Sequence, residues 1–135
     1  MSYGGGTALQ GAVYQRLVTD PAVADLVGSA VHDAAPADFS GGTYVTLGPE
    51  SVRDASDVTG RGAWHDFVVS VVSDEAGFQT AKDVAAAVTD ALTGQELALA
   101  RGRVVGLWFL SAQARRVEKA GKRRIDLTFR ARIEL

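Results

Sequence analysis

Few residues of this sequence have the types and spacing that catalysis or metal binding needs. The two histidines, His32 and His65, lie far apart, and the chain has no cysteine. Zinc sites are built from cysteine and histidine ligands at close spacing, so the sequence contains no zinc motif. A single histidine in or beside a strand is typical of a structural, hydrogen-bonded residue. We therefore expect no metal, no cofactor and no catalytic histidine.

Hydroxyl groups are concentrated in one polar segment, residues 50–62, which reads ESVRDASDVTGRG. Ser51, Ser56 and Thr59 lie there, and a nucleophilic hydroxyl needs a histidine base that the fold brings to it. His65 is the candidate base, so a small hydrolase is one hypothesis for this chain. No histidine lies within the segment itself, which makes this the weakest of the functional hypotheses.

The same segment carries two carboxylates and two glycines that resemble functional patterns only in part. Asp54 and Asp57 are better explained as a solubilising pair in a loop than as an acid–base pair. The glycines of TGRG, residues 59–62, lack the Lys-Ser/Thr and the strand-to-helix context of a phosphate-binding loop. The sequence therefore gives no support for nucleotide binding.

Basic side chains gather near the turn between the last two predicted strands. They could meet phosphates or an acidic protein surface. Because aromatic residues for base stacking are not interleaved with them, we favour a protein surface over a nucleic acid. A solvated hairpin whose charges discourage aggregation is the simplest alternative. The residues of this predicted hairpin tip are Arg115, Arg116, Lys119, Lys122, Arg123 and Arg124.

Charge is distributed unevenly along the chain, although the net charge is only −2. Residues 1–98 hold 4 basic and 13 acidic side chains, a net charge of −9, whereas residues 99–135 hold 10 basic and 3 acidic, a net charge of +7. Such asymmetry indicates either a nucleic-acid-binding face or two complementary surfaces on one subunit.

The strongest structural pattern is the alternation at the C-terminus. From residue 123 onward the odd positions, Arg123 aside, are apolar, as in Ile125, Leu127 and Phe129, and the even positions are polar. This period of two predicts a strand with one buried face. An apolar run at 104–116 precedes it, and Gly121 can take the positive φ of a turn. We predict a long antiparallel hairpin, with the apolar face of its last strand against the core.

Helical periodicity and capping residues predict helices on either side of the other strands. Thr7 is expected to cap the first helix after a flexible arm at 1–6, and Asp20-Pro21 to start a second one that ends at Gly28. A longer helix is expected to start near Gly77 and to run to about Leu92. Its expected buried stripe is Phe78, Ala81, Val84, Ala85, Val88 and Leu92.

The remaining segments are expected to be short strands and loops. Strands are expected at 30–33, 44–47 and 63–73, a long loop at 50–62, and a further extended piece at 97–99. At 135 residues the chain fits one domain, residues 1–135. The predicted fold class is α+β, a mainly antiparallel sheet with a long C-terminal hairpin and helices packed on one face. No apolar run is long enough to span a membrane, and the N-terminus lacks a secretory signal pattern.

The motifs TGRG-x-x-H and FRA-x-IE, together with several longer segments, resemble those of one known family, the tail-terminator or tail-completion proteins of long-tailed phages and gene transfer agents. The most specific feature is the combination of TGRG-x-x-H at 59–65 with the terminal FRA-x-IE at 129–134. The matching segments are YVTLG (44–48), DASDVTGRGAWHDFVVSVVS (54–73), AKDVAAAVTDAL (81–92), GRVVGLWFLSAQARR (102–116) and GKRRIDLTFRARIEL (121–135).

This resemblance implies a structural protein, not an enzyme. It implies a ring, usually of six subunits, at the head-proximal end of the tail tube in a virion or gene-transfer-agent particle that is assembled in the bacterial cytoplasm. The implied partners are other copies of the chain, the tail tube protein and the head connector or stopper protein. DNA would pass through the ring lumen without specific binding, and no membrane would be involved. The main alternative is a small nucleic-acid-binding module acting through the hairpin tip.

An acidic body and a basic hairpin can pair head-to-tail between copies, and head-to-tail contacts that close form a ring. The arm at 1–6 and the loop at 50–62 are then expected to contact partners. The candidate contact residues are Arg53, Asp54, Asp57 and Arg61 in the loop, together with the six residues of the hairpin tip.

Overall fold

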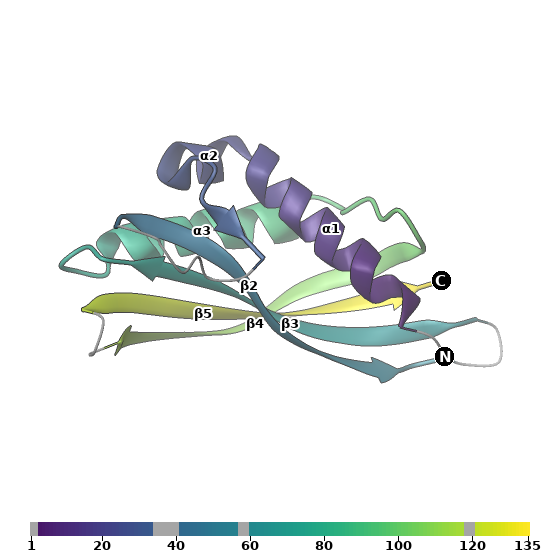
Figure 1. Cartoon of the computed structure of the whole chain (residues 1–135). Helices are drawn as coiled ribbons and strands as arrows, with labels where there is room; N and C mark the ends of the chain where they lie inside the picture. Colours follow the sequence, from purple (N-terminus) through teal and green to yellow (C-terminus); the bar gives the residue numbers. More distant parts are fainter. Residues whose placement is uncertain (1–2, 34–40, 57–59, 118–120) are drawn as a thin grey trace.

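The computed structural model describes residues 3–33, 41–56, 60–117 and 121–135, which form three helices and five strands (Figure 1). In chain order they are α1 (Gly4–Thr19), α2 (Pro21–Val27), β1 (Val31–His32), β2 (Thr43–Asp54), β3 (Gly62–Ser73), α3 (Gln79–Thr93), β4 (Arg103–Val117) and β5 (Lys122–Glu134).

The five strands form one twisted sheet in the order β1-β2-β3-β5-β4. β1 runs parallel to β2, and the other neighbours are antiparallel. All three helices lie on one face of the sheet, and the opposite face carries no helix (Figure 1). The predicted fold class, α+β with a long C-terminal hairpin, is confirmed.

The core lies between the helices and the two central strands, β3 and β5. The alternation predicted for the C-terminal strand is present, because Ile125, Leu127 and Phe129 are buried and the residues between them are only half-buried. Phe129 stacks on Phe67 of β3 with ring centroids 5.5 Å apart. Each such buried side chain stabilises the fold by about 1.5–3 kcal/mol. The predicted stripe of α3 faces this core, with Phe78 packed at its margin.

The start of α2 follows the predicted capping. The backbone N–H of Val23 donates a hydrogen bond to the Asp20 carboxylate at 3.1 Å, and Pro21 occupies the first helical position. A side-chain oxygen at this position satisfies an amide that the helix itself cannot, a contribution of about 1 kcal/mol.

The first helix begins earlier than Thr7, so the prediction of a flexible arm was wrong for residues 4–6. α1 begins at Gly4, and Gly5 and Gly6 are buried. A Cβ atom on Gly5 would lie 3.1 Å from Cγ2 of Ile133, so glycine lets the helix approach β5 closely. Packing on the sheet therefore outweighs the low helix propensity of glycine. Met1 and Ser2 lie outside the described residues.

The segment predicted as a long loop is largely strand. β2 continues through Glu50–Asp54, which pair with Phe67–Ala63 of β3, and a bulge between Leu47 and Glu50 accommodates Gly48-Pro49. The polar sequence forms a strand because β3 supplies a partner, even though it offers no apolar face. Residues 57–59 lie outside the described residues. The extended piece expected at 97–99 is not a strand, although Leu97 is buried.

Candidate functional site: the edge strand and the helix-free face

Strand β4 is the last strand of the sheet, and its side chains are unusually exposed. Within the described part of the chain only β5 pairs with it, and the residues from Trp108 to Arg116 are exposed. An edge strand offers unpaired backbone groups to other chains, and apolar side chains gathered on it indicate an interaction site. The four large apolar residues exposed on β4, called here the β4 apolar segment, are Val105 (48%), Trp108 (47%), Phe109 (43%) and Leu110 (44%).

Two bulges place part of this apolar surface at the sheet edge. The register of β4 against β5 shifts between Val104 and Gly106 and again between Phe109 and Ser111. Val105 and Leu110 are the residues that have no paired residue in β5 at these shifts, and both are exposed. Bulges often discourage pairing at an edge. Here they carry apolar side chains instead of charges, which favours contact with a partner.

The helix-free face near the β4 apolar segment carries a cluster of cations around Trp64. The Trp64 ring lies 5.9 Å from the ring of Trp108, and the guanidinium groups of Arg53, Arg130 and Arg132 lie 5.3–5.8 Å from it. Arg130 also donates two hydrogen bonds to Asp66, at 2.8 and 3.0 Å. Hydrogen bonding from Arg130 holds the pKa of Asp66 below its ordinary value. Cation–π contacts and the ion pair therefore fix this surface in one arrangement.

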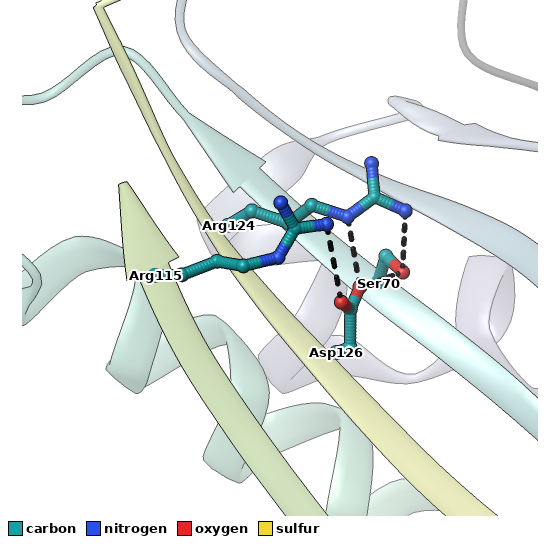
Figure 2. A network of polar contacts seen from close by, with 4 residues as sticks. All are labelled: Ser70, Arg115, Arg124 and Asp126. Atoms are coloured by element: carbon teal, nitrogen blue, oxygen red, sulfur yellow. Dashed lines mark hydrogen bonds and ion pairs between the residues drawn. The ribbon is translucent and has the colours of Figure 1, made fainter. Parts of the chain in front are cut away.

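A second polar network lies on the same face nearer the β4–β5 turn (Figure 2). Ser70 donates to Asp126 at 2.6 Å, Arg124 donates to Asp126 at 2.8 Å, and Arg124 also donates to Ser70 at 3.1 Å. Arg115 of β4 reaches the other oxygen of Asp126 at 3.6 Å. Burial opposes ionisation of Asp126, but the bonds from Ser70 and Arg124 and the nearby arginine charges outweigh it, and its pKa is lowered.

These contacts divide the predicted hairpin tip between two faces of the sheet. Arg115 and Arg124 point to the helix-free face, whereas Arg123 donates to the Glu75 carbonyl at 3.2 Å and lies over the Phe78 ring. Neighbouring residues of a strand point to opposite faces, so consecutive basic residues do not form one patch.

The other tip residues contribute separately. Lys122 lies over the Tyr44 ring, with its amine 5.8 Å from the ring centroid. Arg116 is exposed on β4 opposite Arg123. Lys119 lies outside the described residues.

The predicted loop residues lie at the other end of the sheet from the hairpin tip (Figure 1). Arg53 is part of β2 and joins the cluster around Trp64. Asp54 ends β2 and accepts a hydrogen bond from Ser56 at 2.8 Å. Arg61 is exposed, and its carbonyl accepts from the Leu135 N–H. Asp57 lies outside the described residues. The two sets of predicted contact residues therefore do not form a single site.

His65 is buried, and the geometry does not join it to the serine of β2. Its exposed fraction is 1%, and its Nδ1 has no hydrogen-bond partner among the described residues. Burial lowers its pKa, so it is neutral near pH 7. Ser51 lies opposite Asp66 and therefore points to the other face of the sheet. Among the described residues no group of histidines and carboxylates could hold a metal ion.

A groove of about 810 Å³ runs between α1 and the segment 97–101. Glycine, alanine and threonine provide much of its lining, and no histidine or carboxylate lines it. Arg16 borders it but donates to the carbonyls of Ala91 and Glu96 at 3.1 and 3.0 Å. The groove therefore brings together no acid–base pair. None of the described helices has the length and apolar character that crossing a membrane demands.

The chain matches the model of one known protein family. The family model described as tail completion protein gp17 matches residues 11–134. The chain belongs to this tail-completion family. It is therefore a structural tail protein, as the resemblance in its sequence predicted.

A solved structure is also similar to this tail-completion protein. It is a chain of the virion of a native gene transfer agent particle, with 65% sequence identity and a TM-score of 0.91. The match covers 99% of the present chain and all of the other. No match was found among curated proteins.

Sequence reasoning placed Val105, Trp108, Phe109 and Leu110 in an apolar run and did not identify them as surface residues. The exposure of all four excludes the core. A signal was present, because residues 104–110 are apolar except for one glycine and lack the alternation of a strand with one buried face.

Proposed function

We propose that this chain is the subunit of a ring, the six-membered ring implied by its family, at the head-proximal end of a tail tube. The ring stops growth of the tube and joins it to the head connector. The observation that carries the proposal is the β4 apolar segment on an unpaired edge strand. A single copy leaves this surface in water, and a neighbouring copy would cover it.

Family membership and the similar chain from a gene transfer agent particle support this role. The separation of charge supports a head-to-tail contact, because residues 1–98 are net acidic and residues 99–135 are net basic. Head-to-tail contacts close into rings when the rotation between neighbours divides a full turn. The role needs no substrate turnover, and DNA would pass through the lumen without being read.

The nucleic-acid-binding alternative receives less support. Arg115 and Arg124 already pair with Asp126, and Arg123 lies on the opposite face. A phosphate-binding patch would need several of these cations free on one surface.

The proposal is tested by mass photometry and negative-stain microscopy of the purified protein with and without tail tubes. We expect a discrete oligomer, seen as a ring bound at one end of each tube, and no further growth of capped tubes. A protein that stays monomeric and never attaches to tube ends would contradict the proposal.

A further inference from the structure

The sheet has two open edges among the described residues. The outer side of β4 is open along its whole length. The outer side of β2 is open beyond Thr46, because β1 pairs only with Val45 and Thr46. We infer that these two edges pair with each other in neighbouring copies, so that Glu50–Asp54 of one copy extends the sheet beside β4 of the next. This inference rests on the proposed ring and specifies its subunit contact.

Strand direction supports this pairing. β3 is antiparallel to both β2 and β5, and β5 is antiparallel to β4. β2 and β4 therefore run in opposite directions. A second copy placed beside the first in a similar orientation brings its β2 antiparallel to β4, with the helices of both copies on the same side. Antiparallel pairing is slightly more stable per residue than parallel pairing.

The open part of β2 and the β4 apolar segment also lie at the same position along the strand direction. Val52 pairs with His65, which pairs with Ala131, which in turn pairs with Leu107. By the same route Glu50–Asp54 are level with Val104–Phe109, which is where most of the β4 apolar segment lies. A neighbour aligned in this way would cover the apolar side chains that one copy exposes.

The faces and charges of the two edges are complementary. Arg53 lies on the same face as Trp64 and Trp108, so the Arg53 of a neighbour would approach the exposed Trp108 ring. Of the arginines on β4, Arg103 adjoins the stretch that is level with Glu50–Asp54, and β4 carries no carboxylate, whereas the described residues 31–33 and 41–56 carry three carboxylates and one arginine. Burial raises the pKa of Glu50, so a cation supplied by a neighbouring copy would favour its ionised form.

Pairing between copies would cover both open edges of the sheet, whereas a different partner bound to β4 would leave the β2 edge open. Head-to-tail pairing in a closed ring covers every β4 and every β2 edge. Two-fold pairing of β4 with β4 would bring like charges together and leave β2 open. The repeated contact between copies is therefore assigned to β2 and β4.

Disulfide cross-linking tests this assignment, because the natural chain has no cysteine. Val52→Cys and Leu107→Cys are introduced into one chain. Within a copy β3 and β5 separate these strands, a distance of roughly 14 Å from the usual strand spacing. A disulfide cannot span that distance. Mild oxidation of purified protein and of assembled particles should give a ladder of covalent oligomers that ends at the closed ring.

Three controls make the result specific. Each single-cysteine variant should give no covalent species, since a head-to-tail contact never brings two identical residues together. Val52→Cys combined with Ala114→Cys, on the same face of β4 but farther along it, should cross-link much less. Glu50→Cys or Asp54→Cys in place of Val52→Cys allows for a two-residue difference in register, because these positions share the face of Val52 and Leu107. Melting temperatures confirm that each variant folds.

The outcomes separate the contact from the ring itself. Covalent dimers from Leu107→Cys alone would show two-fold pairing of β4 and overturn the inference. Rings seen by microscopy without cross-links from positions 50, 52 or 54 would overturn the β2–β4 contact and leave the ring intact. The absence of any ring would instead contradict the proposed function.

Discussion

Replacing Leu110 with lysine should prevent ring formation and leave the fold intact. Leu110 lies at a bulge on the open edge of β4 and is 44% exposed. Lysine on an edge strand opposes pairing with another strand, because its charge must be removed from water when a partner covers it. The folded single copy keeps this side chain in water and should tolerate the change.

The size of the effect follows from the exposed area. Burying a whole leucine side chain contributes about 1.5–3 kcal/mol, so covering the exposed part contributes about 0.7–1.3 kcal/mol per contact. Summed over a ring of six contacts, this is about 4–8 kcal/mol. The cost of desolvating an unpaired lysine adds to the loss. Rings should therefore be absent at protein concentrations at which the natural chain assembles.

Leu26→Lys is the matched control, because Leu26 on α2 is 43% exposed and lies away from the sheet edge. Both variants should melt within about 1–2 °C of the natural chain, since surface changes usually alter stability by less than about 0.5 kcal/mol. Mass photometry should detect rings for Leu26→Lys and only single copies for Leu110→Lys. Equal ring formation by the two variants would refute the role of the β4 edge.

Three further predictions concern the fold. Gly11→Ala should raise the free energy of unfolding by about 0.8–1 kcal/mol, because the added Cβ meets no atom within 4 Å. Gly5→Ala should stabilise the fold less, because its Cβ would crowd Ile133. Thermal melting of the two variants measures the difference. The natural chain should lose stability as pH falls below about 6.5, since the lowered pKa of His65 means that the unfolded chain takes up its proton first. Denaturant titrations of His65→Phe should lack this loss, and an unchanged pH profile would show that another group titrates. Asp126→Asn should destabilise the fold by about 1–3 kcal/mol at pH 7. This difference should shrink as pH falls below about 4 through the lowered pKa of Asp126, and a constant difference down to pH 2 would contradict the network.

Local sequence patterns were sufficient to predict those elements whose structure is determined by burial of one face or by a capping residue. The alternation from Ile125 to Ile133 predicted β5 and its buried face, and Asp20-Pro21 predicted the start of α2. Both signals depend on neighbouring residues in the sequence. Packing of distant segments reinforces them and does not compete with them.

Prediction failed where a distant partner decides the structure. Glu50–Asp54 have no apolar pattern and are strand because β3 lies beside them. Gly5 is helical because its close packing on Ile133 of β5 favours a residue without a side chain. Neither relation can be read from the residues adjacent to these segments.

The candidate contact surface was predicted only in part for the same reason. Charge marked the hairpin tip and Arg53, but the strand order that makes β4 an edge comes from tertiary pairing. The β4 apolar segment becomes a candidate site only when that order is known, because the same residues on a central strand would belong to the core.

Locating this chain in intact particles tests the central claim most directly. Cryo-electron microscopy of tailed particles carrying the tagged protein should show one closed ring where the tail meets the head, with neighbouring sheets joined edge to edge. Density for a single copy per particle, or for the protein at another position in the tail, would contradict the account.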